Sequence, residues 1–181
     1  MWSGNYSNLM IKNPKVLPIV FVLVGVLARL LPHAPNFTPI GAITIFGGAK
    51  LPKTIALFLP VLIMIIADIF LGFHSLIGYT WGMMLLTSVI SYKLLRDRPS
   101  VSRLLTVTLL SSFLFFIVTN LGVWLEGKMY VMTLSGLIQC YVMALPFFKN
   151  SLIGDLFYMS VFFGFFEIIR NFNSRYSNID A

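Results

Sequence analysis

Charged residues are scarce in this chain: Lys, Arg, Asp and Glu make up 10% of its 181 residues, and only six residues are acidic. Soluble domains carry roughly 25% charged residues, and no segment here is polar enough to form a separate soluble domain. Hydrophobic residues supply 58% of the sequence instead. The composition therefore predicts an integral membrane protein, with a single transmembrane domain over residues 1–181.

The chain has only one cysteine and none of the common catalytic motifs. Cys140 is the single cysteine, which excludes an intrachain disulfide. The sequence has no His-Glu-x-x-His zinc motif, no Gly-x-Ser-x-Gly nucleophile turn and no Gly-rich loop leading to a phosphate-binding Lys. We therefore expect no enzyme activity, no cofactor and no metal site. A chain without an ATP site cannot energise transport by ATP hydrolysis on its own.

The net charge of +7 indicates which loops of the chain face the cytoplasm. In a soluble protein it would suggest a nucleic-acid partner, but the cytoplasmic loops of membrane proteins collect Lys and Arg. We therefore expect the lipid bilayer, and no nucleic acid, as a partner. With the N-terminus inside, ten of the 13 basic residues face the cytoplasm. These are Lys12, Lys15, Lys50, Lys53, Lys93, Arg96, Arg98, Arg103, Arg170 and Arg175, whereas Arg29, Lys128 and Lys149 lie outside.

This charge distribution predicts a multi-pass protein of the bacterial inner membrane with residues 1–15 and 171–181 in the cytoplasm. The first apolar run is interpreted as a retained helix and not as a cleaved signal peptide, because further spans follow and no small-residue cleavage site is evident. A seven-span arrangement would still leave nine basic residues inside and four outside. Charge alone therefore does not decide between six and seven spans.

The apolar runs predict an all-α fold with about six transmembrane helices. The expected spans are Val16–Leu31, Pro39–Ala49, Thr54–Leu71, Gly78–Leu95, Leu104–Trp124 and Asn150–Ile169. The second is too short to cross a core of ~30 Å, so we expect it to be buried among other helices or joined to the next span in a broken helix. Pro146 and the cluster at 149–151 divide the last apolar region, which makes Thr133–Phe147 a surface or re-entrant helix.

A Pro-rich polar segment, the elbow (residues 29–38), joins the first two apolar runs. Irregular backbone near lipid persists only where protein or a water-filled cavity covers it, so the elbow predicts the rim or lid of a site. On the expected topology other polar and aromatic residues gather at the same outer side. The candidate substrate-binding residues are Arg29, His33, Asn36, Asp68, His74, Tyr79, Asn120, Trp124 and Tyr141.

Several of these residues have an equally ordinary structural interpretation. Arg29 and Asp68 could simply pair with each other, because an unpaired charge within a span costs at least ~2.5 kcal/mol. Asn120 could cross-link two helices, and His74 could cap a turn. Trp81, Trp124, Tyr79 and Tyr130 could belong to the interfacial aromatic belt. Cys140 is expected to serve packing, and Glu167 and Arg170 are expected to pair at a helix end.

The motifs together resemble a known group of membrane proteins. Residues 35–42 (Pro-Asn-Phe-Thr-Pro-Ile-Gly-Ala), 67–72 (Ala-Asp-Ile-Phe-Leu-Gly) and 146–148 (Pro-Phe-Phe), with the short second span, are similar to the substrate-binding S components of energy-coupling factor (ECF) vitamin transporters. More closely, the chain resembles an uncharacterised bacterial membrane family related to them, from Arg29 to about Gly164. The motifs that carry this closer resemblance are 29–33 with 36–39, 72–74, Thr119-Asn120 with Trp124, 136–141, and Pro146-Phe147 with Gly154-Asp155.

The resemblance implies a six-helix protein without catalysis that binds a vitamin or metabolite at its outer face, beneath the loop between the first two helices. It implies that an ATPase module with a scaffold subunit is a partner, and that the elbow is the lid. S components commonly carry small residues four apart on the first helix, where the scaffold docks. Here Gly25 and Ala28 are three apart, so this part of the pattern is not matched.

The sequence thus predicts a membrane-embedded protein that binds a small metabolite or vitamin from outside and helps to import it. One alternative is a non-catalytic structural or assembly subunit of a larger membrane complex, in which Asp68 and His74 would contact other residues with no cavity between them. A second alternative is a membrane enzyme that uses His33, His74 and Asp68, which would then converge. The transport hypothesis predicts a cavity bounded by the elbow and lined by aromatic side chains.

Overall fold

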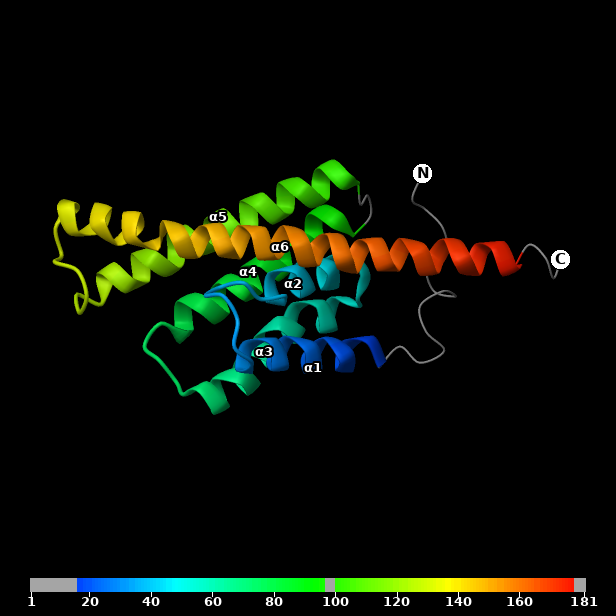
Figure 1. Ribbon diagram of the computed structural model, residues 1–181, viewed down its shortest axis with the longest axis horizontal. Helices are drawn as coiled ribbons and strands as arrows, with labels where there is room; N and C mark the ends of the chain where they lie inside the picture. Colours follow the sequence, from blue (N-terminus) through cyan, green and yellow to red (C-terminus); the bar gives the residue numbers. More distant parts are fainter. Residues whose placement is uncertain (1–15, 97–99, 178–181) are drawn as a thin grey trace.

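The computed structural model describes residues 16–96 and 100–177, and in this part of the chain it shows six helices and no strand. The predictions for residues 1–15, Arg98 and 178–181, and for the side chain of Arg175, lie outside what is described. The all-α prediction is confirmed. The helices are α1 (Val16–Leu30), α2 (Ile40–Lys50), α3 (Lys53–Leu71), α4 (Ile77–Leu95), α5 (Val101–Leu125) and α6 (Leu134–Ser177) (Figure 1).

Three of these helices are long and apolar enough to cross a membrane. They are α3, α5 and the Leu134–Arg170 part of α6, whereas α1 and α2 are shorter apolar helices. Large apolar side chains remain exposed on the outside, among them Phe58, Phe70 and Phe165, each at least 60% exposed. Lipid would cover such a surface without cost, and these helices give the chain the character of a membrane protein.

The short helix α2 forms the centre of the bundle. Nine of its 11 residues are buried, and it contacts all five other helices. Phe46 packs against Phe21 of α1 and against Phe163 and Phe166 of α6, with ring centroids 5.0–5.8 Å apart. Gly48 allows α2 to approach the backbone of α4 closely. The prediction that this span is buried among other helices is confirmed.

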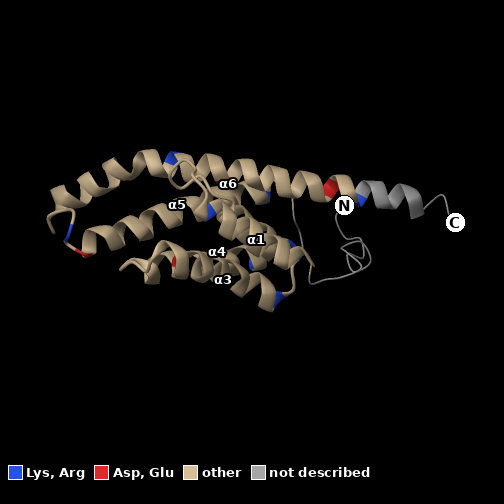
Figure 2. Cartoon of the chain, turned by 60° about the horizontal axis from the view of Figure 1, so that its bottom comes forward, with Lys and Arg blue, Asp and Glu red and all other residues tan. Residues whose placement is uncertain are grey.

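The last apolar region differs from the prediction. Residues Leu134–Ser177 form one continuous helix of 44 residues that includes Pro146, so the predicted division into a surface helix and a last span is wrong. Proline removes one backbone hydrogen bond and bends a helix, and Figure 2 shows α6 bending along its length. Packing on α5 keeps both sides of the proline helical, because Tyr141 and Phe148 each contact the ring of Phe116.

Basic side chains mark the end of the bundle where α2, α4 and α6 meet. Arg96 Nη1 donates to the carbonyl oxygen of Leu51 at 2.6 Å, and Lys50 Nζ lies 4.4 Å from the ring centroid of Phe166. Arg170 pairs with Glu167 one helical turn earlier, as predicted. The elbow joins the C-terminal end of α1 to the N-terminal end of α2. The basic residues lie at the C-terminal end of α2, so the candidate site is at the other end of the bundle.

Candidate functional site

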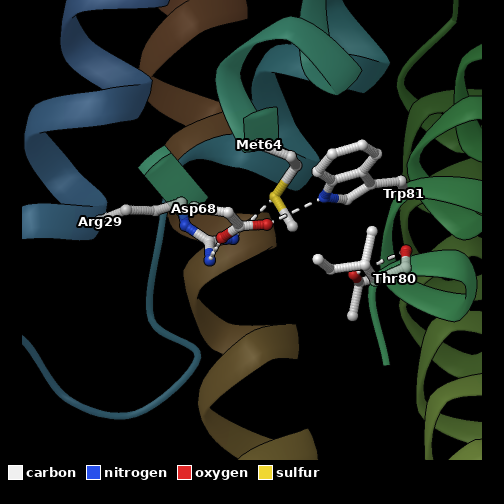
Figure 3. Close-up of polar contacts among 6 residues, drawn as sticks. Arg29, Met64, Asp68, Thr80 and Trp81 are labelled. Carbon is white, nitrogen blue, oxygen red and sulfur yellow. Dashed lines mark hydrogen bonds and ion pairs between the residues drawn. The ribbon is translucent and has the colours of Figure 1, made fainter. Parts of the chain in front are cut away.

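An ion pair with a fully buried carboxylate fixes the last turn of α1, where the elbow begins. Arg29 Nη2 lies 2.7 Å from Asp68 Oδ1, and Trp81 Nε1 donates to Asp68 Oδ2 at 2.9 Å. Figure 3 shows these side chains converging from α1, α3 and α4, with Met64 beside them. The Arg29–Asp68 pairing is confirmed. Because both carboxylate oxygens are occupied and Asp68 is 0% exposed, its first role here is to hold three helices together.

The elbow is irregular but well anchored. Asn36 adopts φ 62°, a left-handed conformation that Asn tolerates better than most residues. Asn150 Nδ2 of α6 donates to the carbonyl oxygen of Pro35 at 3.1 Å, and the ring of Phe37 packs against Phe157 and Tyr158 of the same helix. These contacts hold the elbow against α6, so it covers the space between the helices beneath it.

A cavity of ≈ 230 Å³ lies beneath the elbow. Residues from the elbow and from all six helices line it, so it is central to the bundle. Its wall combines apolar groups with a few polar ones, as small-molecule sites do. The lining residues are Arg29, His33, Asn36, Thr38, Ile40, Gly41, Ile45, Met64, Leu71, Met84, Thr87, Ser111, Ser112, Phe115, Ser151 and Asp155.

A second cavity of ≈ 240 Å³ adjoins the first between α4, α5 and α6. It contributes the aromatic side chains Phe116, Phe147 and Phe148 to the site, with Thr119 and Asn120 as polar groups. The two cavities share four lining residues, which are Asn36, Ser112, Phe115 and Ser151. We treat them as one site with two compartments.

The polar wall of the first compartment centres on Asp155 of α6. Asp155 is only 8% exposed, and Ser112 Oγ of α5 donates to its Oδ2 at 2.7 Å. Its other oxygen, Oδ1, lies directly against Gly41 in the first turn of α2, where a larger residue would collide with it. Ser111 Oγ in the same wall is buried and makes no hydrogen bond within the described part of the chain.

The predicted site residues divide into two groups. Arg29, His33 and Asn36 line the first compartment and Asn120 lines the second. The side chain of Asn120 donates to the carbonyl oxygen of Phe116 in its own helix. The others line neither compartment. Asp68 is buried behind Arg29, His74 is exposed in the α3–α4 loop, Tyr79 packs on Gly122, Trp124 Nε1 donates to Val131, and Tyr141 donates to Ile117.

Sequence reasoning missed the polar residues of α5 and α6 that line the cavity. Ser111, Ser112, Ser151 and Asp155 were not among the candidates. In the sequence Asp155 stands out only as part of the Gly154-Asp155 pair among the motifs of the family resemblance. Because α6 is continuous, Asp155 lies in its interior, and an acidic residue inside an apolar helix is itself the signal of a functional site.

The enzyme hypothesis requires His33, His74 and Asp68 to converge. In the described ranges no group of three or more His, Cys, Asp or Glu residues is arranged to hold a metal ion. His33 Nδ1 lies 2.7 Å from the carbonyl oxygen of Leu31, and Asp68 is engaged by Arg29 and Trp81. These three residues therefore form no common centre.

The fold and the cavity define a helical bundle of membrane character with a partly polar site between its helices. Residues 10–178 match the model of DUF6580, described as a family of unknown function, and the chain belongs to this family. Neither a curated protein nor a solved structure matches the chain.

Proposed function

We propose that this protein binds a small metabolite or vitamin within the membrane and takes part in its uptake, in the manner of an ECF S component. The observation that carries the proposal is the partly polar cavity beneath the elbow, which is bounded by His33, Asn36 and Thr38 and has the aromatic wall residue Phe115. A structural subunit would need the Arg29–Asp68 pair but no such cavity. No metal or catalytic centre is part of the proposal.

The proposal includes a topology of about six spans in the bacterial inner membrane, with the N-terminus in the cytoplasm and the elbow outside. The grouping of Lys50 and Arg96 near the α2–α3 junction supports it, because basic residues collect on the cytoplasmic side. An ATPase module with a scaffold subunit is the proposed energising partner. Gly25 of α1 is not free to receive a scaffold, because it packs against Ile63 of α3.

Filling the cavity should abolish ligand binding without unfolding the protein. Ser151 lines both compartments, so a phenyl ring in the Ser151→Phe variant would occupy the site. Ser160 lies nine residues further along the same helix and is exposed, so Ser160→Phe is the matched control. The measurement is a thermal-shift screen of the detergent-purified proteins against vitamins, cobalamin and nucleobase-like metabolites.

We expect one compound class to raise the melting temperature of the wild type and of Ser160→Phe, but not of Ser151→Phe. A hundredfold excess of ligand over its dissociation constant stabilises the folded state by roughly 2.7 kcal/mol, which a melting curve detects easily. A shift that persists in Ser151→Phe would place binding elsewhere. No shift with any compound would favour the structural-subunit alternative and direct attention to co-purifying proteins.

The topology can be tested with a single introduced cysteine. The Cys140→Ala background removes the buried native thiol, and Lys149→Cys places a new thiol on α6 on the predicted outer side. We expect a membrane-impermeant maleimide to label Lys149→Cys in intact cells. Lys93→Cys on α4, on the predicted cytoplasmic side, should be labelled only after permeabilisation. The reverse pattern would overturn the proposed orientation.

A further inference from the structure

Among the described residues, the carboxylate of Asp155 has no basic partner. Its only side-chain hydrogen bond within the described residues comes from Ser112, and no ion pair includes it there. A buried carboxylate without a counter-charge is strongly unfavourable, and acidic residues inside membrane helices usually face a cavity and mark a ligand or ion path. Asp155 meets this description because it lines the cavity wall.

The other charged residue of the wall does not balance Asp155. Arg29 also lines the cavity, but its guanidinium is held by Asp68, 2.7 Å away, and forms no ion pair with Asp155. The two charges of the Arg29–Asp68 pair cancel. Asp155 is therefore the one acidic residue of the described wall without a basic partner, and the N-terminal turn of α2 at Gly41, which carries partial positive potential, lies against it.

Further hydrogen-bonding groups lie in the same wall as the Asp155 carboxyl group. Ser111 is 4% exposed, and its Oγ has no partner in the described chain. Thr87, which is 2% exposed, and the half-buried Ser151 add further hydroxyl groups. A cavity wall that combines a carboxylate with several hydroxyl groups is suited to a ligand that donates several hydrogen bonds from a positively charged centre.

We propose that the cavity takes a ligand with an ammonium or amidinium group, and that Asp155 is the residue that selects this charge. This inference rests on the proposed binding function and names the chemical class of its ligand. In the complex, Asp155 Oδ1 accepts hydrogen bonds from the cationic group of the ligand while Ser112 continues to orient Oδ2. The aromatic second compartment then receives the uncharged remainder of the molecule.

The test compares matched probes that differ in charge and little in shape. Benzamidinium is paired with benzamide, and n-butylammonium with n-butanol, and dissociation constants are measured by isothermal titration of the detergent-purified full-length protein. A hydrogen bond to a charged group contributes more than a neutral one, so we expect each cation to bind about tenfold or more tightly than its neutral partner. Asp155→Asn should reduce this ratio to about one.

The control variant is Glu126→Gln, which makes the same carboxylate-to-amide change at the end of α5, where Glu126 lies 3.6 Å from Lys128. It should keep the wild-type ratio. Equal affinity of cation and neutral partner in the wild type overturns the proposal, even if Asp155→Asn fails to fold. Retention of the preference in Asp155→Asn overturns it as well. A metabolite screen in which no compound raises the melting temperature of the wild type would instead count against the binding function itself. The failure of this inference and the failure of the proposed function are therefore distinguishable.

Discussion

Replacing Asp68 with alanine is expected to lower the free energy of unfolding by about 3–5 kcal/mol, because it leaves the Arg29 guanidinium without its partner in a largely buried position. Asp68 is 0% exposed and accepts hydrogen bonds from both Arg29 and Trp81. Its loss therefore loosens α1, α3 and α4 from one another. Reversible unfolding in mixed detergent with increasing SDS measures the effect.

A double variant separates the cost of an unpaired charge from the cost of lost packing. In Arg29→Met with Asp68→Leu, both charges are replaced by apolar groups, which is often neutral or stabilising relative to a buried ion pair. We expect the double variant to recover most of the stability lost in Asp68→Ala. If Asp68→Ala alone costs less than about 1 kcal/mol, the pair behaves like an exposed salt bridge, and the fixing role assigned to it is wrong.

Replacing Gly48 with alanine should be the second severe change. An added Cβ would lie 2.5 Å from Cβ of Ser91 and 2.7 Å from the backbone nitrogen of Tyr92. The backbone atoms of a packed helix cannot move locally to make room, so α2 and α4 must separate. Overpacking of this kind typically lowers the free energy of unfolding by about 1–3 kcal/mol. The same SDS titration measures the loss of stability.

Gly82 offers the matched control on the facing helix α4. A Cβ at this position would meet nothing within 4 Å, and alanine has the higher helix propensity by about 1 kcal/mol. Gly82→Ala should therefore be neutral or slightly stabilising. If Gly48→Ala were as harmless as Gly82→Ala, the close approach of α2 to α4 would not be a feature of the folded protein.

The positions of the helices could largely be predicted from the sequence. The apolar runs predicted where most helices lie, and the shortness of the second run predicted that α2 is buried. The one clear failure is the helix break predicted at Pro146, where α6 is continuous. Proline does favour a break there. The contacts of Tyr141 and Phe148 with Phe116 outweighed this local preference for a break. Such contacts depend on where α5 lies, and the residues around Pro146 do not reveal that.

Only the part of the site that local sequence marks could be predicted. The elbow is marked by prolines and polar residues, so Arg29, His33 and Asn36 were found, and each lines the cavity. Ser111, Ser112 and Ser151 are ordinary residues in apolar helices, and only the packing of α5 against α6 makes them cavity walls. His74 and Trp124 are conspicuous in the sequence but line neither compartment, because rarity in a sequence says nothing about position in the bundle.

The central position of α2 constrains how the chain assembles during synthesis. A helix of 11 residues is about 16 Å long, roughly half the thickness of the hydrocarbon core, so α2 cannot insert as a stable independent span. The helices α4, α5 and α6, which cover it, leave the ribosome later. Complete insertion of α2 must therefore wait for them, and a nascent chain that ends after α3 would hold α2 in a position different from its final one.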